Sequence, residues 1–378
     1  MGNLLSYWEQ KMYFSNVDFT VVGAGIVGLH CALKLRTEFP KSSIVVLERG
    51  LLPQGASTKN AGFACFGSVS ELLDDLNTHT ESQVLELVEK RYKGLRQLKA
   101  TLGSQQIGYK HHKGFELFLK DAPEIYRRCM DKFAEINKLL YPIFNKEVFT
   151  TQKNNFSFKG VFDNYLVNDF EGQLDTGKMM HALYRKCVQN DITILYGLHV
   201  NGYELKGGDV LIKTALLDFR STKLCIATNG LYDGPAVDQQ NVKPARAQVL
   251  ITKPIPNLHL KGTFHLDRGF YYFRNIDNRI LLGGGRNLDM QTEQTTVFDT
   301  TKVIQDKLDQ LLRNVILPNT EVEVDSRWSG IMGVGNSKHP IVKKIADNVF
   351  CGVRLGGMGI AIGSQVGEDL ANLTMKYV

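Results

Sequence analysis

Cysteine pairs are missing from this sequence, which has only six cysteines in 378 residues. None of them forms a Cys-x-x-Cys motif, and this absence argues against a zinc knuckle or a redox-active dithiol. Several lie in apolar stretches, so we expect reduced, mostly buried thiols and no metal site. The cysteines are Cys31, Cys65, Cys129, Cys187, Cys225 and Cys351.

Long apolar runs and dense basic runs are lacking too. No stretch approaches about 18 uncharged apolar residues, so we predict no membrane span. The first residues, MGNLLSYWEQKMYF, have no continuous apolar core, which argues against a secretory signal. A net charge of +6 without a basic cluster gives no reason to expect a nucleic acid partner. These absences predict a soluble, cytoplasmic protein.

The hydrolase motif Gly-x-Ser-x-Gly does not occur, which disfavours a hydrolase built on that nucleophile turn. With 43% hydrophobic and 22% charged residues, the composition is that of an ordinary globular protein. A chain of 378 residues usually exceeds one hydrophobic core. We therefore expect two domains.

The stretch FTVVGAGIVGLHCALKL, residues 19–35, predicts a buried strand, a glycine turn and a helix. In a dinucleotide-binding turn, Gly23 would form the tight turn, Gly25 would let the backbone approach a pyrophosphate, and Gly28 would let the helix pack closely. The next predicted strand ends at Glu48, whose carboxylate can accept both hydroxyls of an adenosine ribose. An acid there disfavours a 2′-phosphate, so we expect FAD or NAD rather than NADP.

A second strand, glycine turn and helix are predicted near the other end of the chain, in NVFCGVRLGGMGIAIGSQVGEDLANL. Its helix would begin near Ala361, with its N-terminus toward an anionic group. Backbone amides and a helix dipole would stabilise negative charge on a reduced isoalloxazine, which favours FAD. Because only one complete glycine turn with a following acidic strand is present, a pyridine-nucleotide reductase is disfavoured.

Taken in order, these motifs resemble the D-amino acid oxidase-like family of FAD-dependent oxidoreductases, which includes glycine, sarcosine and γ-glutamylputrescine oxidases. The resemblance covers essentially the whole chain. It rests on VVGAGIVGL with Glu48, GASTKNAGF, GQLDTGKMMHAL, IATNG, KPARAQVL, YYFRNIDNRILLGGGR, RWSGIMG and GGMGIAIG. Within the family, KNAGF and GGGR look closest to the amine and γ-glutamylputrescine oxidases.

The resemblance implies an α/β (α+β) fold, with a Rossmann-like FAD-binding domain and a substrate domain built on an antiparallel sheet. We predict that 15–90, 150–235 and 325–378 form the FAD-binding domain, and that 91–149 and 236–324 form the substrate domain. The apolar spacing over 81–102 predicts a helix between the two. The alternation around Asp277 and Asn278 predicts a hairpin.

The resemblance also implies which residues contact FAD. They are Gly23, Gly25, Ile26, Val27, Gly28, Glu48, Arg49, Ser57, Thr58, Lys59, Asn60, Ala61, Val200, Thr228, Asn229, Gly230, Gly330, Arg354, Gly356, Gly357, Met358, Gly359 and Ile360. Sarcosine oxidases attach flavin through a cysteine in the segment that matches RWSGIMGVG, and this sequence has none there. Non-covalent FAD is therefore expected. Two departures, NSKHPIVKK in a flavin-side loop and Arg354 in GVRLGG, leave those positions open.

For the substrate site, a carboxylate would need a buried cation, preferably the two-pronged guanidinium of arginine. The candidates are Arg246, Arg274, Arg286 and Arg354, of which we favour the last two. Tyr271 and Tyr272 point to opposite faces of a predicted strand, so one of them would face the pocket. We expect His265 and His339 to be structural.

The expected reaction is oxidation of the C–N bond of an amino acid or amine, by hydride transfer to flavin N5. The imine would hydrolyse in water, and oxygen or another acceptor would reoxidise the flavin. No dedicated base is required. Alternatives are an FAD-dependent 2-hydroxyacid dehydrogenase, which would need a histidine base such as His339, a flavin-dependent tRNA-modifying enzyme, and a flavin-binding module without turnover.

Overall fold

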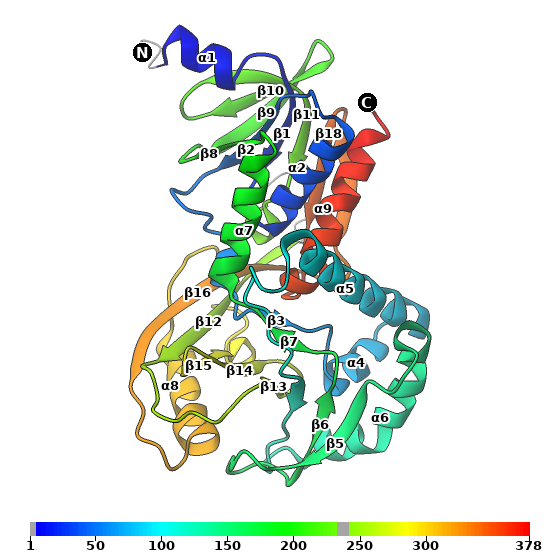
Figure 1. Cartoon of the computed structure of the whole chain (residues 1–378), viewed down its shortest axis with the longest axis vertical. Coiled ribbons are helices and arrows are strands. Elements are labelled where there is room, and N and C mark those ends of the chain that lie inside the picture. Colours follow the sequence, from blue (N-terminus) through cyan, green and yellow to red (C-terminus); the bar gives the residue numbers. More distant parts are fainter. Residues whose placement is uncertain (1–4, 233–241) are drawn as a thin grey trace.

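The computed structural model describes residues 5–232 and 242–378. Two eight-stranded sheets dominate it (Figure 1). The first sheet lies in the upper half of the figure, near both termini, and the second in the lower half. A two-stranded sheet, formed by β3 (Phe63–Ala64) and β7 (Gly172–Gln173), lies between them.

The first sheet has a parallel centre, with the order β17-β18-β11-β1-β2-β8, and β10 and β9 extend it antiparallel from β11. Consecutive parallel strands need a crossover helix, as the sequence pattern indicated. The strands are β1 (Val17–Val22), β2 (Ile44–Glu48), β8 (Thr193–Tyr196), β9 (Val200–Lys206), β10 (Asp209–Thr214), β11 (Asp218–Ile226), β17 (Ile341–Ala346) and β18 (Val349–Val353).

Helices α2 (Ile26–Glu38) and α9 (Gly359–Met375) follow the two glycine turns and pack against each other. Helix α7 (Thr176–Gln189) packs beside α2, and α1 (Tyr7–Tyr13) precedes the sheet. The apolar core of this half joins α2, α7 and α9 to the central strands. Both cofactor-type units predicted from the sequence thus meet in one half of the molecule.

The second sheet has the order β16-β12-β15-β14-β13-β4-β6-β5 and is antiparallel except at the β13–β4 pair. Asp277 and Asn278 form the hairpin turn between β14 and β15, both with positive φ, as predicted. The strands are β4 (Gly114–Glu116), β5 (Phe149–Lys153), β6 (Asn164–Asn168), β12 (Lys243–Thr252), β13 (Thr263–Leu266), β14 (Tyr271–Ile276), β15 (Arg279–Gly284) and β16 (Val324–Val334).

Helix α8 (Lys302–Leu311) packs on one face of this sheet, against β12 and β15. It continues into a π-helical turn, η3 (Leu312–Ile316), and both pack on the sheet's apolar core. Two short 3₁₀ turns, η1 (Asn229–Leu231) and η2 (Arg286–Leu288), follow β11 and β15.

The helix predicted over 81–102 is α5 (Glu81–Leu102), which packs on α9 at one side and on α4 and α6 at another (Figure 1). The remaining helices are α3 (Ala56–Lys59), α4 (Val69–Leu76) and α6 (Pro123–Phe144).

The sheet pairing bears on the predicted domain ranges. Strands β5, β6 and β16 hydrogen-bond into the second sheet, although most of their residues fall in ranges predicted for the FAD-binding domain. Sequence order alone did not reveal these partners, because the pairings are non-local. The Rossmann-like α/β fold with an antiparallel second sheet is confirmed, and the exact partition into domains stays a prediction.

All six cysteines are free and buried, as predicted. Within the described part of the chain, no helix has the length and hydrophobicity needed to cross a lipid bilayer. None of the predicted site residues lies at 1–4 or 233–241, the positions outside the described part of the chain.

Candidate active site

A continuous cavity of about 620 Å³ runs between the two sheets. It starts at the carboxyl ends of β1 and β2, passes the N-terminus of α9, and reaches the face of the second sheet. Ligands of open α/β sheets bind at this carboxyl edge. The volume lies in the usual range of ligand pockets.

The first glycine turn is built for close approach. Gly23 has φ +108°, and a Cβ there would lie 2.8 Å from the carbonyl oxygen of Ala227. A Cβ on Gly28 would lie 1.9 Å from the carbonyl oxygen of Gly23. Gly28 therefore allows α2 to start directly against the turn, and it does not itself line the cavity. Gly23, Gly25, Ile26 and Val27 do line it, with the N-terminus of α2 facing the cavity wall.

Glu48 ends β2 where the sequence predicted, buried and at the cavity wall. Its Oε2 accepts the N–H of Ala24 at 3.2 Å and its Oε1 accepts the N–H of Gly50 at 3.1 Å. Each carboxylate oxygen keeps a further lone pair for a sugar hydroxyl. Arg49 and Val200 line the same end of the cavity.

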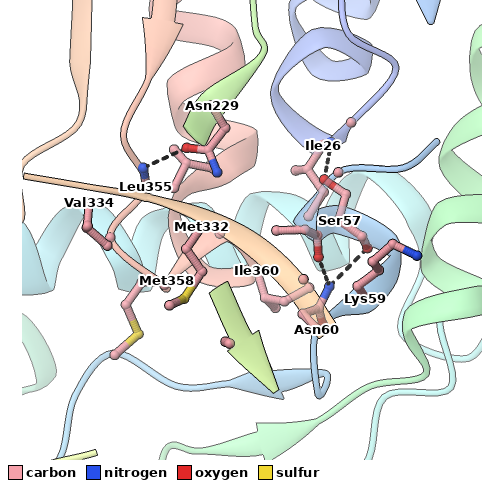
Figure 2. A pocket seen from close by; sticks show the side chains of 18 of the residues that line it. Ile26, Ser57, Lys59, Asn60, Asn229, Met332, Val334, Leu355, Met358 and Ile360 are labelled. Atoms are coloured by element: carbon pink, nitrogen blue, oxygen red, sulfur yellow. Dashed lines mark hydrogen bonds between the residues drawn. The ribbon is translucent and has the colours of Figure 1, made fainter. Parts of the chain in front are cut away.

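The loop at 55–62 is held by its own side chains (Figure 2). Ser57 Oγ accepts the N–H of Ile26 at 3.0 Å, which ties the loop to the start of α2. Asn60 Nδ2 donates to the carbonyls of Ala56 and Ser57, at 3.0 and 2.9 Å. Asn60 therefore lines the cavity, but its side-chain NH₂ group bonds to the loop backbone. Lys59 and Ala61 also line the cavity, and their side chains make no hydrogen bond to the loop.

The second glycine turn brings the N-terminus of α9 to the cavity. Gly356, Gly357, Met358, Gly359 and Ile360 all line it. Asn229 Oδ1 accepts the N–H of Leu355 at 3.1 Å and so fixes the turn to the end of β11 (Figure 2). First-turn amides of a helix favour an anionic group. Thr228 and Gly330 complete this wall.

One face of the second sheet closes the cavity. His265, Tyr272 and Val249 line it, and they lie in one row across the sheet because His265 pairs with Tyr272, which pairs with Gly283 beside Val249. Burial raises the pKa of Tyr272 to about 12, so its hydroxyl is protonated. Tyr271 points to the opposite face, into the apolar core. Arg286, just beyond β15, also lines the cavity.

Five predicted residues do not line the cavity: Gly28, Thr58, Gly230, Tyr271 and Arg354. Thr58 Oγ1 donates to the carbonyl of Pro53 at 2.7 Å. Arg354 Nε donates to the carbonyl of His339 at 2.9 Å, away from the cavity. Both acceptors, the carbonyls of Pro53 and His339, belong to residues outside the cavity lining.

The candidate arginines differ in whether they reach the cavity. Arg246 is buried, and its guanidinium donates two hydrogen bonds to the Glu293 carboxylate, from Nε to Oε2 at 2.7 Å and from Nη2 to Oε1 at 2.8 Å. Arg274 Nη1 donates to the carbonyls of Gly62 and Leu174. Neither lines the cavity, so Arg286 is the predicted arginine that reaches it.

Sequence reasoning missed several charged groups in the cavity wall. They are Glu71, Asp74, Asp75, Arg91, Arg268 and Lys338, together with His265, which we expected to be structural. His265 Nε2 lies 2.9 Å from Oε2 of the buried Glu171. His339, by contrast, does not line the cavity.

Within the described residues, Cys65, Glu171 and His265 bring donor atoms within 4.8 Å of one another. Burial raises the pKa of the Cys65 thiol well above its usual range, so the sulfur is protonated and a poor metal ligand. Glu171 already binds His265 and the Thr263 hydroxyl. The group is therefore best explained as a hydrogen-bonded pair beside a neutral thiol.

Comparison with known proteins agrees with this geometry. Residues 18–373 match the DAO family, described as FAD dependent oxidoreductase. Because the match covers most of the chain, the protein belongs to this family, and the resemblance noted from the sequence is confirmed. No curated protein sequence matches the chain significantly.

Solved structures share the fold. Glycine oxidase from Geobacillus kaustophilus has 15% identity and a TM-score of 0.76, with 96% of this chain and 95% of that one covered. L-proline dehydrogenase from P. horikoshii has 16% identity, a TM-score of 0.71 and coverage of 96% and 94%. L-α-glycerophosphate oxidase from Mycoplasma pneumoniae, solved with FAD bound, has 14% identity, a TM-score of 0.70 and coverage of 95% and 94%.

The protein is thus an FAD-dependent oxidoreductase. The described cavity fits the cofactor, because its glycine turn leaves no room for a Cβ, Glu48 offers lone pairs at the ribose end, and the α9 amides offer donors at the other.

Proposed function

We propose that the protein oxidises the C–N bond of an amino acid or amine, with FAD held non-covalently along the cavity. The observation that carries the proposal is the continuity of the cavity, from the α2 turn past the N-terminus of α9 to Tyr272 and Arg286 on the second sheet. A cofactor lying along it would reach the polar face of that sheet. The predicted contacts that line the cavity are the ones we assign to FAD.

FAD supplies a hydride acceptor for the substrate carbon. The chain's own contribution is placement and environment. The N-terminal residues of α9 line the cavity, so their amides would stabilise negative charge on a bound cofactor without reorganising. Phe63, Ala61 and Val249 give the cavity apolar walls that exclude water from the reacting C–N bond.

Tyr272 and Arg286 are the substrate-facing residues of this proposal. Tyr272 offers a protonated hydroxyl, and the only hydrogen bond of the Arg286 guanidinium to the described residues goes to the sulfur of Met290. An arginine without a carboxylate partner in a cavity wall can bind an incoming polar group. The imine product would leave and hydrolyse in water, without a protein base.

A matched pair of variants tests this assignment. Arg286→Gln removes the cavity-facing guanidinium, whereas Arg279→Gln removes an arginine at the start of the preceding strand, β15, that pairs with Asp325. Loss of a charged hydrogen bond costs about 1.5–3 kcal/mol. Flavin reduction under anaerobic conditions should slow, or substrate affinity fall, by at least tenfold in Arg286→Gln only. Equal behaviour of the two variants would remove Arg286 from the site.

One observation favours a second candidate, oxidation of a 2-hydroxyacid. That reaction needs a base for the hydroxyl proton, and the structure puts His265, not His339, in the cavity wall beside Glu171. Burial lowers the pKa of His265, but the charge and hydrogen bond of Glu171 outweigh it and raise the value to about 9. His265 is therefore protonated at neutral pH, so hydroxyacid oxidation would rise steeply toward pH 9. An amine must be unprotonated to release hydride, so amine oxidation also rises with pH, and substrates have to be compared at one pH. Failure of 2-hydroxyacids to reduce the flavin at pH 9, where amino acids reduce it, argues for the amine reaction.

A further inference from the structure

Arg91 is a buried guanidinium at the substrate end of the cavity. It lies in α5 with 2% of its surface exposed, and it lines the cavity wall. Its only hydrogen bond to the described residues runs from Nη1 to the carbonyl of Phe66, at 2.8 Å, and Nε has no partner. A buried cation with unused donors is costly unless an anion satisfies it.

His265 is a second cation in the same wall. Glu171 is itself fixed by Asn168 Nδ2 at 3.2 Å and by Thr263 Oγ1 at 3.1 Å, and it holds His265 Nε2. An imidazolium donates from both nitrogens. Nδ1 has no hydrogen bond to the described residues, so its N–H is unused.

Both cations lie beside the segment that contains Cys65. The sulfur of Cys65 lies within 4.8 Å of donor atoms of His265 and Glu171, and Arg91 bonds to the carbonyl of the next residue, Phe66. Cys65 Sγ also lies 3.9 Å from Met358 Sδ, at the start of α9. Arg91 and His265 therefore flank the part of the cavity next to the turn that we assign to the flavin.

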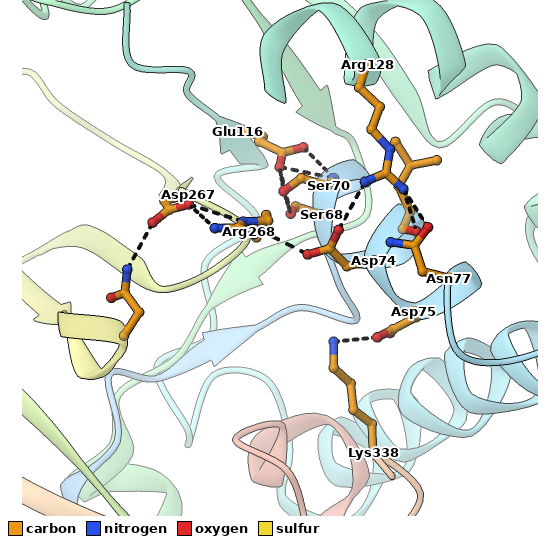
Figure 3. Close-up of polar contacts among 12 residues, drawn as sticks. Ser68, Ser70, Asp74, Asp75, Asn77, Glu116, Arg128, Asp267, Arg268 and Lys338 are labelled. Carbon is orange, nitrogen blue, oxygen red and sulfur yellow. Dashed lines mark hydrogen bonds and ion pairs between the residues drawn. The ribbon is translucent and has the colours of Figure 1, made fainter. Parts of the chain in front are cut away.

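The nearby carboxylates are mostly engaged elsewhere (Figure 3). Asp75 Oδ1 pairs with Lys338 at 2.5 Å, while its buried Oδ2 has no hydrogen bond to the described residues. Asp74 pairs with Arg128 at 3.2 Å. Glu116 accepts bonds from Ser68, Val69 and Ser70.

Glu71 accepts the N–H of Ser68 at 3.0 Å. The charged and titratable groups that act on His265 are thus Glu171, Glu71 and Glu116, with the neutral thiol of Cys65 beside the ring. Only Glu171 bonds to His265 directly. The charges of Asp75 and Glu71 act on Arg91, but no carboxylate of the described residues bonds to it.

We propose that Arg91 and His265 form the subsite for the substrate's carboxylate, so that the substrate is an amino acid rather than an amine without a carboxylate. The inference rests on the proposed function. Arg91 and His265 bind the carboxylate, and Glu171 is a positioning residue that keeps His265 charged. Two buried cations with free N–H donors would bind a substrate carboxylate more tightly than the corresponding uncharged amide.

The first test measures binding without turnover. Acetate and acetamide are titrated into the FAD-loaded protein, and the flavin absorbance reports binding. Arg91→Gln and His265→Asn should weaken acetate binding at least tenfold and leave acetamide binding within about threefold. Arg268→Gln is the control, because this half-exposed arginine lines the same cavity but pairs with Asp267. FAD content and the melting temperature of each variant show that it has folded.

The second test uses pH. Wild-type acetate affinity should fall as pH rises through about 9, where His265 loses its proton. Glu171→Gln keeps a hydrogen-bonding side chain but removes the charge, and burial then lowers the pKa of His265. The fall in acetate affinity should therefore move well below pH 9 in this variant, a shift that a merely structural Glu171 would not produce.

Two results would overturn the subsite. One is acetate affinity unchanged in both Arg91→Gln and His265→Asn; the other is acetate affinity that depends on Arg286 alone. Failure of the proposed function looks different, because acetate would bind through Arg91 and His265 while no amine or amino acid reduces the flavin. If amines without a carboxylate reduce it as well as amino acids do, the proposed function stands and the subsite is wrong.

Discussion

Gly28→Ala tests whether the turn before α2 is built for FAD. The added Cβ would sit 1.9 Å from the carbonyl oxygen of Gly23, and this neighbour is backbone rather than a flexible side chain. A carbon and a carbonyl oxygen approach to about 3.3 Å at best, so the helix and the turn must separate by about 1.4 Å. Overpacking of this kind costs about 1–3 kcal/mol, and sometimes more.

The displacement falls on the segment that carries the α2 amides, so cofactor binding should suffer more than folding. We expect purified Gly28→Ala to retain less than a tenth of the wild-type FAD per chain, with a melting temperature several degrees lower. Gly202→Ala is the matched control, because a Cβ there meets nothing within 4 Å and Gly202 lies in β9. Full FAD content in Gly28→Ala, measured by flavin absorbance after denaturation, would refute the reasoning.

Three further predictions follow from buried carboxylates. Glu48→Gln places the side-chain NH₂ group opposite the backbone N–H of Ala24 or Gly50, where the carboxylate had accepted a hydrogen bond. FAD affinity, measured by titration of the apoprotein, should therefore fall about tenfold. Unchanged affinity would show that Glu48 does not contribute to cofactor binding. Glu293→Gln leaves a buried arginine uncompensated and should cost about 3–5 kcal/mol in urea unfolding, while the flavin spectrum of the folded protein stays unchanged. Folding raises the pKa of His265 from 6.5 to about 9. Protonated His265 therefore stabilises the folded protein by about 3 kcal/mol below pH 6.5, and this contribution is lost as pH rises to 9. Glu171→Gln should abolish this pH dependence of the unfolding free energy, and an unaltered dependence would contradict the assignment.

The sequence predicted best what is encoded locally. The glycine turns at 23–28 and 356–359, the acid at the end of β2 and the helix α5 each depend on a short run of residues. Spacing and residue type are enough there, because a turn, a cap or an amphipathic stripe is decided within a few residues.

The substrate end depends on pairing between distant segments, and there the sequence fell short. Glu171 and His265 are 94 residues apart and meet because β13 pairs with β4, which pairs in turn with β6. Arg91 did carry a signal. It interrupts the apolar stripe of α5 between Val88 and Leu95, on the face that packs inward, and a charge in such a place needs a reason.

Arg354 and Tyr271 show the opposite case. Both lie next to cavity residues in the sequence, but β14 alternates its side chains between faces, and Arg354 turns back toward the carbonyl of His339. Adjacency in sequence placed the segment correctly and could not give the direction of the side chain.

The most direct test of the central claim is anaerobic mixing of the FAD-loaded protein with separate amino acids, N-methyl amino acids, polyamines and 2-hydroxyacids, while the oxidised-flavin absorbance is followed. If the protein oxidises amino acids as proposed, an amino acid should bleach the flavin rapidly, and ammonia or an amine should be released as the imine hydrolyses. Bleaching by 2-hydroxyacids alone, or by none of these compounds, would contradict this proposal.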